Sequence, residues 1–379
     1  MSDAARPTEA DLEAAGLYDP EAPDAGERLD LLAHLLDQGC SLDDLVAAEA
    51  VGRLTSAAAD ARVRGGQRPV DIDELARLAG VEATLIAQAW RSIGFPDPPP
   101  GARLWWPSDA DTFAAFALGA ELFGPDRLAQ FSRVLGRAAA QVAEAAIAMF
   151  VTDVQVRLEG DRRPPGEMAS AFMDAQGAAD TLPGVFETAF RHHLEVAQRR
   201  LDATDFSAGR HRPTFCVGFA DLVGSTELAH RLDPKSTARL AADLEQVATD
   251  TVAGVGGRLV KTIGDGILFT TVRTPSALAI ATELVGWAQG DERLQGLRVG
   301  LAMGPVVWQD GDVHGPVVNL AARLCTAADG GQVLVDPAFA AAHREADHRG
   351  AELVPAGEVA LRGFADLVAT FTPPPTPIH

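Results

Sequence analysis

The sequence predicts an α+β protein, with an all-helical N-terminal domain at residues 1–204 and a domain of mixed strands and helices at residues 213–372. Two observations predict this division. Before about residue 205, Ala, Leu, Arg and Glu recur at helical spacing and runs of Val, Ile and Thr are scarce; beyond it, short apolar runs alternate with helical stretches. The polar segment 205–212 predicts a hinge, and the proline-rich tail 373–379 predicts loose order.

Length and composition indicate a globular chain and limit its partners. Its 379 residues suffice for two domains, and 47% apolar with 22% charged residues is typical of folded proteins. The formal net charge of −21 opposes non-specific binding to nucleic acid and to anionic membranes, because both are negatively charged. A chain of this charge that handles a polyanion needs a local source of positive charge, such as bound metal.

The cysteines and the N-terminus predict a cytoplasmic protein. Cys40, Cys216 and Cys325 are odd in number, lie far apart and have no CxxC or His-rich neighbourhood, so we expect reduced, buried thiols. The N-terminus lacks the basic-then-apolar order of a signal peptide. No stretch reaches the roughly 18 uncharged apolar residues of a membrane span, so no integral membrane segment is expected.

Chain breakers divide the first domain into an expected series of about eight to ten short helices. The last, residues 184–202, is predicted to be a linker helix with an apolar stripe that suits packing on a partner. The stripe comprises Phe186, Phe190, Leu194, Ala197 and Leu201. His192 and His193 border it beside arginines, so protonating them near neutral pH would weaken the packing, which predicts a regulatory pH response. Two solvated histidines are the alternative.

Two further interpretations of the first domain are open. Residues 70–98 have the cadence of a helix-turn-helix with Gly80 at the turn, but the reading helix offers only Arg91 as a base. A DNA-reading surface should be basic, so helix packing is favoured and no nucleic-acid partner is expected. Residues 104–124 and 145–151 supply aromatic and small apolar side chains for a lipid-like effector cavity, although such side chains more often form core.

The second domain is predicted to alternate strands and helices. We expect strands within 214–220, 258–272, 297–308, 332–336 and 358–371, of which the second is a hairpin turning at residues 264–266. We expect helices at 225–253, 275–289 and 316–329. The order of the first six elements matches the ferredoxin-like βαββαβ plan.

Two acidic residues stand where strands are expected to end. Asp221 follows the apolar run CVGFA, and Asp265 lies at the tip of the hairpin. A carboxylate directly after a buried strand is held by a rigid element, and Mg²⁺ prefers one or two carboxylates with phosphate oxygens completing its shell. Either residue alone is explained equally well as a helix cap or a turn former.

A second polar group lies on and before the helix expected at 316–329. Asn319 and Arg323 are four residues apart and therefore share one helix face, and Asp312 lies in the loop before the helix. On an otherwise apolar helix these side chains need partners once buried. A solvated outer face is the simpler alternative.

Six residues in this order and spacing resemble the class III nucleotidyl cyclases. They are Asp221, Lys261, Asp265, Asp312, Asn319 and Arg323, within FADLVGST, VKTIGDGILF and GDVHGPVVNLAARL. The similarity extends over residues 213–372, and the short connection GPVVWQDGDVHG resembles the subgroup with an abbreviated dimerisation arm.

The resemblance implies a role for each residue. Asp221 and Asp265, with the backbone carbonyl of Leu222, would hold two divalent ions, Mg²⁺ or Mn²⁺. Asn319 would orient the ribose, and Arg323 would neutralise charge on the α-phosphoryl group. The implied phosphate contacts are the amides of Val223, Gly224, Ser225 and Thr226 at a helix start, with Arg362 at the terminal phosphate.

Lys261 indicates which purine is bound. The chain has only one other lysine, Lys235, and otherwise uses arginine. Lys261 can only donate and ionised Asp312 can only accept, which complements N1 and N6 of adenine and mismatches guanine. A surface ion pair of Lys261 with Asp265 would tolerate arginine. The expected reaction is therefore the conversion of ATP to cyclic AMP.

The resemblance also implies a homodimer. In the family, Lys261, Asp312, Asn319 and Arg323 come from one subunit and the metal-binding carboxylates from the other. The whole chain resembles the pH-responsive, autoinhibited adenylate cyclases of mycobacteria, which carry a helical N-terminal domain. The alternative is a catalytically silent cyclase fold that serves signalling, or a DNA-binding regulator that uses residues 70–98.

Overall fold

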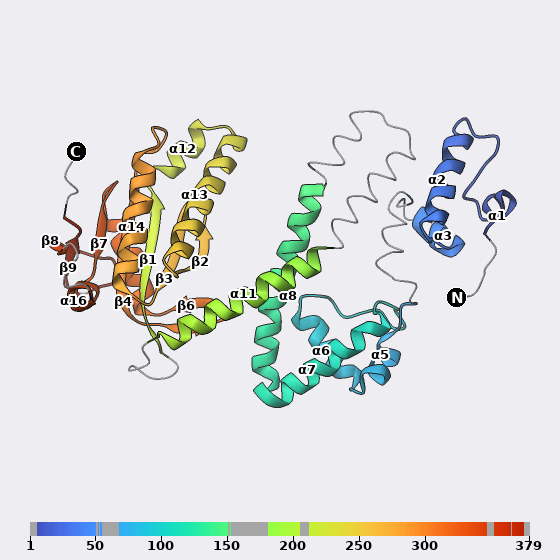
Figure 1. Ribbon diagram of the computed structural model, residues 1–379, viewed down its shortest axis with the longest axis horizontal. Coiled ribbons are helices and arrows are strands. Elements are labelled where there is room, and N and C mark those ends of the chain that lie inside the picture. The colour runs from blue at the N-terminus through green and yellow to red at the C-terminus, as the bar shows by residue number, and fades with distance from the viewer. Residues whose placement is uncertain are drawn as a thin grey trace. The chain divides into compact units, whose positions relative to one another are not determined.

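The computed structural model describes residues 6–50, 68–150, 181–204, 212–346, 352–364 and 366–374, with the single residues 52, 54 and 152. The chain divides into two compact units, Met1–Ala189 and Phe190–His379. The described part of the first unit is helical, whereas the second is built on a sheet, so the predicted α+β class is confirmed (Figure 1). The expected hinge, apart from Arg212, lies outside the described residues.

The first unit contains helices around two separate cores. One core gathers leucines between Leu12 and Leu54, and the other gathers residues between Val70 and Phe113. One helix, α8, runs for 26 residues, longer than the short helices expected, because its alanine-rich sequence has no proline after Pro125 and tolerates the single internal glycine, Gly136. The helices are α1 Glu9–Ala14, α2 Ala25–Asp37, α3 Leu42–Ala50, α5 Ile72–Ala79, α6 Ala83–Ser92, the 3₁₀ turn Pro107–Asp109, α7 Ala110–Phe123 and α8 Pro125–Phe150.

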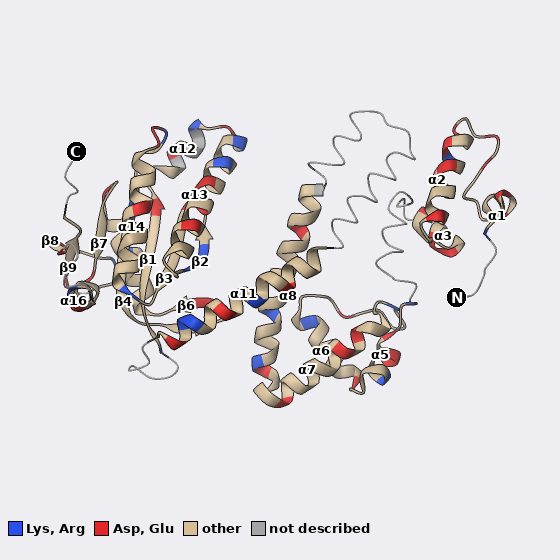
Figure 2. Cartoon of the chain, viewed as in Figure 1, with Lys and Arg blue, Asp and Glu red and all other residues tan. Residues whose placement is uncertain are grey.

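The helix-turn-helix cadence at residues 70–98 corresponds to α5 and α6. Asp71 caps α5 by accepting from the amide of Glu74 at 2.9 Å, and Gly80 ends it at φ 67°, a left-handed conformation that favours glycine. Arg91, the base of the expected reading helix, forms an ion pair with Asp97 at 2.7 Å. Acidic positions lie along α5 (Figure 2). This charge pattern gives no support to a DNA-reading role.

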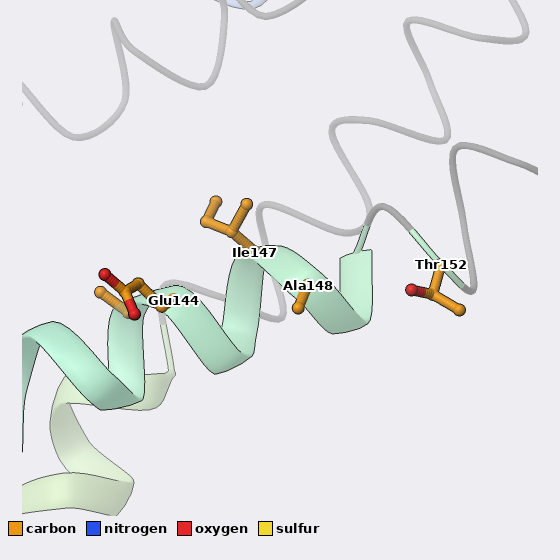
Figure 3. Close-up of a pocket in the computed structure, with 5 residues that line it drawn as sticks. Glu144, Ile147, Ala148 and Thr152 are labelled. Atoms are coloured by element: carbon orange, nitrogen blue, oxygen red, sulfur yellow. The ribbon is translucent and has the colours of Figure 1, made fainter. Parts of the chain in front are cut away.

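The aromatic residues expected to line an effector cavity belong partly to the core. Trp105 and Phe113 are buried in the second helical core. A hollow of about 550 Å³ lies along the end of α8, where Ile147 and Ala148 of the expected segment line it together with Glu144 and Thr152 (Figure 3). Residue 151 and the side chain of Phe150 lie outside the described residues. A lipid-like effector at 104–124 and 145–151 stays a prediction.

The helix α11, Leu182–Asp202, covers the expected linker helix and crosses the division between the units. It contains no buried residue. Its last turn belongs to the second unit, where Arg200 Nε donates to the carbonyl oxygen of Gly256 at 3.3 Å. The apolar stripe of α11 is thus largely exposed, as a surface that awaits a partner would be.

The second unit is a seven-stranded sheet in the order β2-β3-β1-β4-β7-β9-β8, in which only β4 and β7 are parallel. The first four strands reproduce the ferredoxin-like plan that the sequence predicts. The strands are β1 Thr214–Leu222, β2 Arg258–Ile263, β3 Gly266–Thr271, β4 Leu297–Pro305, β7 Val333–Val335, β8 Val354–Val359 and β9 Val368–Thr372. The helices are α12 Ser225–Arg231, α13 Pro234–Gly254, α14 Thr274–Gln289, α15 Pro316–Ala327 and α16 Pro337–Ala346.

Alternating side chains of the central strands build a core on each face of the sheet. Cys216, Ala220 and Leu222 of β1 pack with α13, α14 and α16, whereas Phe215 and Val217 pack with α15. The helix α15 lies directly on β4, because a Cβ at Gly300 would come within 2.2 Å of the α15 backbone. Figure 1 shows α13 and α14 running along the sheet. Asp221 falls in the β1 register that faces α15.

Four features differ from expectation. The helix expected at 225–253 is two helices, because Asp233 precedes Pro234 and caps α13 by accepting from the Ser236 amide at 3.0 Å. The strand expected at 358–371 is split between β8 and β9, and α16 was not anticipated. A small hairpin, β5 Val307–Gln309 with β6 Asp312–His314, occupies the short connection before α15.

Candidate active site

The carboxylates of Asp221 and Asp265 are brought together by strand pairing. Asp221 near the end of β1 is opposite Gly266 at the start of β3, so Asp265 at the hairpin tip lies one residue from that pair. Neighbouring strands are about 4.8 Å apart, which places both acids at one edge of the sheet. Gly264 takes φ 63°, as the first position of a two-residue type II′ hairpin loop requires. The convergence that the sequence suggests is therefore present within one chain.

Arg298 of β4 neutralises Asp221. Its Nη2 and Nε donate to Asp221 Oδ2 at 2.6 and 3.1 Å, and its Nη1 donates to the carbonyl oxygen of Thr326 on α15 at 3.2 Å. Asp221 and Arg298 face each other in the β1–β4 register. Asp265, by contrast, has a buried Oδ2 without a hydrogen-bond partner among the described residues. Asp221 thus has one oxygen paired with an arginine, and Asp265 has one buried oxygen without a partner among the described residues.

The two carboxylates fit a divalent cation. Oxygen is the donor that Mg²⁺ and Mn²⁺ prefer, and an orphaned buried carboxylate oxygen is costly unless a cation or a donor satisfies it. A Cβ at Gly266 would lie 3.8 Å from Asp221 Oδ1, so glycine keeps the space beside that oxygen open. Among the described residues, no further His, Cys, Asp or Glu completes a cluster of three. Substrate oxygens and water would therefore have to complete the coordination shell.

Lys261 and Asp312 form a second pair on the same face of the sheet. Lys261 Nζ donates to Asp312 Oδ2, and the amide of Val313 donates to Asp312 Oδ1 at 2.8 Å. Burial alone would raise the pKa of Asp312, but the hydrogen bonds from Lys261 and Val313 outweigh it, and the pKa is lowered. The carboxylate is therefore ionised at neutral pH. A fixed donor and a fixed acceptor stand side by side.

The helix α15 presents the third group of predicted residues. It begins at Pro316, two residues after β6 ends, because Gly315 at φ 142° reverses the chain. Asn319 and Arg323 are exposed, and neither makes a side-chain hydrogen bond or ion pair with another described residue. In the single chain, Asn319 and Arg323 therefore lie on a solvated face of α15, which is the simpler of the two alternatives that the sequence left open. It also leaves both side chains available to a ligand or to a second copy.

The loop after β1 offers fewer amides than expected. The Val223 amide donates to the carbonyl oxygen of Gly296 at 3.0 Å and is therefore occupied. The amides of Gly224, Ser225 and Thr226 precede or begin α12, where a helix supplies no internal acceptor. Gly224 takes φ 70°, and a Cβ there would meet Gln295 Oε1 at 2.8 Å. A phosphate contact by these three amides stays a prediction.

The residues at this edge lie within a segment that matches a known family. Residues 209–372 match the model described as the adenylate and guanylate cyclase catalytic domain. An adenylate cyclase of Streptomyces coelicolor is 34% identical over 286 residues, which cover 73% of this chain and 72% of that protein. The chain belongs to the class III nucleotidyl cyclases.

Two mycobacterial relatives of this cyclase extend the similarity into the helical half. An uncharacterised protein of Mycobacterium tuberculosis, Rv2212, is 33% identical over 331 residues, which cover 85% of this chain and 84% of that protein. A protein of the same species named pH-sensitive adenylate cyclase MT1302 is 28% identical over 322 residues, which cover 82% of this chain and 78% of that protein. Across the described residues, every helix is too short or too polar to cross a membrane.

Three other residues with predicted roles make no hydrogen bond or ion pair with the site residues within the described part of the single chain. Arg362 is exposed in the loop between β8 and β9. Strands β4 and β7 separate β9 from β1, a span of about 14 Å at ordinary strand spacing. His192 and His193 are exposed on α11, and His192 lies 3.9 Å from Glu195. Roles for these three residues stay predictions.

Sequence reasoning missed two residues of the site. Arg298 lies in the strand run LRVGL, where a single arginine gives no signal of a functional role. Its partner Asp221 lies near the end of another strand, and the sequence does not show that the two strands pair. Arg258 likewise looks like an ordinary residue of the predicted hairpin, yet it donates to the carbonyl oxygen of Gly311 beside Asp312. A signal was available in the dipeptide Asp310-Gly311, which favours a tight hairpin and so brings the connection back over β2.

Proposed function

We propose that the chain is an adenylate cyclase that converts ATP to 3′,5′-cyclic AMP and pyrophosphate. The observation that carries the proposal is the contact between Lys261 and Asp312. Adenine presents an acceptor at N1 beside a donor at N6, so a touching ammonium donor and carboxylate acceptor match it. Guanine presents the reverse pattern, and each mismatched contact costs about 1–3 kcal/mol when buried. ATP is therefore favoured over GTP.

The reaction needs charge neutralisation more than covalent help from the protein. The ribose 3′-oxygen forms a bond to the α-phosphorus, the bond from that phosphorus to the bridging oxygen breaks, and pyrophosphate leaves with its electrons. The 3′-hydroxyl proton passes to water. Arg323 would neutralise charge on the α-phosphoryl oxygens, and Asn319 would hold the ribose in line.

Asp221 and Asp265 would hold the metal ions of the site. Oδ2 of Asp265 and Oδ1 of Asp221, unpaired among the described residues, are ready to accept a cation, whereas Oδ2 of Asp221 must first release Arg298. Bound Mg²⁺ or Mn²⁺ would supply acidification of the 3′-hydroxyl and positive charge against the triphosphate. The freed guanidinium of Arg298 would then remain within the same site as a cation beside the phosphates. The carbonyl oxygen of Leu222 is a further proposed ligand.

The complete site is proposed to form between two copies of the chain. Asn319 and Arg323 are exposed and unpaired among the described residues, which is the state expected of side chains that act across an interface. Trp308 and Val307 on the β5–β6 hairpin are also exposed, at 39% and 42%. A homodimer with two equivalent sites would use both features.

The helical half is proposed to regulate the catalytic half in response to pH. Support comes from the relative named as a pH-sensitive adenylate cyclase and from the exposed histidines His192 and His193 on α11. A cytoplasmic location is proposed from the three free, buried cysteines. The experiment that tests the proposed function is turnover of ATP and of GTP with Mg²⁺ or Mn²⁺ across pH 5 to 8. If cyclic AMP forms neither with Mg²⁺ nor with Mn²⁺, the proposed function is overturned.

A further inference from the structure

Two basic side chains of β2 reach the β5–β6 hairpin because the strand is irregular. Residues three apart in a regular strand point to opposite faces of the sheet. The register of β2 shifts between Leu259 and Lys261, so Arg258 is opposite Thr270 and Lys261 is opposite Leu268. Thr270 and Leu268 are two residues apart on β3 and therefore share a face. The bulge thus turns Arg258 and Lys261 toward the same side.

Arg258 contacts the peptide that carries Asp312. Its Nη2 donates to the carbonyl oxygen of Gly311, the residue directly before Asp312. Asp310 and Gly311 have φ values of 54° and 76°, as a two-residue type I′ turn requires. Asp312 begins β6 immediately after this turn. The position of the Asp312 backbone therefore depends on a turn that Arg258 holds from β2.

Two contacts from β2 fix the position and the orientation of the β5–β6 hairpin, whereas a single contact would let the hairpin rotate. Lys261 holds the side chain of Asp312 through Oδ2, and Arg258 holds the main chain one residue earlier. A lysine on a flexible stem restricts distance but hardly restricts angle, whereas a planar guanidinium restricts both. Removing Arg258 would leave Lys261 as the one side-chain contact from β2 to the described hairpin turn.

The surroundings of Arg258 make this contact hard to replace. The side chain is half-buried; burial lowers the pKa of its guanidinium, and the negative charge of Asp312 opposes that shift. Burial, and then the charge of Arg258, also lower the pKa of Arg200 at the end of α11. Arg258 thus has the positive charge of Arg200 on one side and the β5–β6 hairpin on the other. The Gly311 carbonyl and the carboxylate of Asp312 offset its own charge.

We infer that Arg258 is a positioning residue for the nucleotide base: it holds the β5–β6 hairpin so that Asp312 and Lys261 meet adenine as adjacent acceptor and donor. The inference rests on the proposed ATP site. Arg258 acts through Gly311 and touches no reacting atom. Its loss should weaken recognition of adenine, which appears in KM, and spare the chemistry carried by Asp221, Asp265 and Arg323, which appears in kcat.

The test compares three variants of the full chain with the wild type. Arg258→Met removes the donors and keeps the apolar stem, Arg258→Lys restores one donor, and Arg239→Met alters an exposed arginine of α13 as a matched control. We expect Arg258→Met to raise KM for ATP about tenfold, with kcat within about threefold of the wild type and a smaller change of KM for GTP. Arg258→Lys should recover part of the loss, and Arg239→Met should match the wild type.

Thermal unfolding of each variant separates positioning from general damage. A KM for ATP within about twofold of the wild type in Arg258→Met would overturn the inference. So would equal increases of KM for both nucleotides together with a lower unfolding temperature, because that pattern indicates a loosened domain. If Arg258→Met does not fold, the changes of KM for ATP and for GTP in Arg258→Lys, each relative to the wild type, are judged by the same two criteria. Wild-type turnover tests the proposed function independently, since it involves no change at Arg258.

Discussion

Replacing Asp312 with asparagine should weaken the preference for ATP over GTP by about 30- to 160-fold in kcat/KM. In the wild type, each oxygen of Asp312 already accepts one hydrogen bond, Oδ1 from the Val313 amide at 2.8 Å and Oδ2 from Lys261, and each keeps a lone pair for a base. The Asp312 side chain is 24% exposed and that of Lys261 is 42% exposed, so both keep surface that a bound base can contact. Asparagine fits the same space but can present either a donor or an acceptor.

The magnitude follows from what each purine loses or gains. Adenine exchanges a charge-assisted hydrogen bond for a neutral one, a loss of about 1 kcal/mol. Guanine exchanges a mismatch at O6 for a donated hydrogen bond, a gain of about 1–2 kcal/mol. The sum of about 2–3 kcal/mol corresponds to about 30- to 160-fold in the ratio of specificity constants. Lys261 remains and keeps ATP preferred in absolute terms.

The assay is initial-rate measurement of cyclic AMP and cyclic GMP formation by chromatography, with Mn²⁺, between pH 5 and pH 8. Burial would raise the pKa of Asp312, but the hydrogen bonds from Lys261 and Val313 lower it below its ordinary value near 4. A carboxylate with a lowered pKa contributes fully above that range and loses its contribution only as pH falls through the lowered value. The wild-type ratio should therefore be flat across the assay. An unchanged ratio in the variant, or a wild-type ratio that moves with pH, would refute the reasoning.

Three further results are expected. Residues 206–379 without the helical half should be about tenfold more active than the full chain and less dependent on pH, and equal rates with equal pH profiles would remove the regulatory proposal. Arg298→Gln should bind Mn²⁺ about fivefold more tightly by titration calorimetry, because Asp221 no longer has to release a cation; weaker or equal binding would contradict that competition. Arg200→Gln should change KM for ATP in the wild-type background but not beside Arg258→Met, and identical changes in both backgrounds would show that Arg200 does not act through Arg258.

Much of the catalytic unit was predictable because its signals are local. The apolar run before Asp221 and the Gly-Asp-Gly tip around Asp265 identify a strand end and a hairpin, and pairing of β1 with β3 then brings the two acids together. The six-residue set predicts the family because the spacing repeats across several elements. Polar residues on the apolar helix α15 were informative for the same reason.

The parts that escaped prediction depend on contacts between distant segments. Arg298 meets Asp221 across 77 residues of sequence, and only the sheet register reveals the pair. The bulge that brings Arg258 beside Lys261 leaves no mark in the sequence, since RLVKTI reads as an ordinary strand. Pro234 does signal the break between α12 and α13, but helix-favouring residues on both sides of it predict one continuous helix.

Each active site is proposed to be shared by two copies of the chain, and mixing two inactive variants shows whether it is. Asp265→Asn removes a carboxylate and Arg323→Ala removes the cation on α15, so each should be inactive alone. Random exchange makes about half of the dimers mixed, each with one intact site of two, so the mixture should regain about a quarter of the wild-type rate. A mixture of Asp221→Asn with Asp265→Asn, both altered on the carboxylate side, should stay inactive. If the first mixture also stays inactive while co-purification of tagged copies proves that mixed dimers form, the shared site is contradicted.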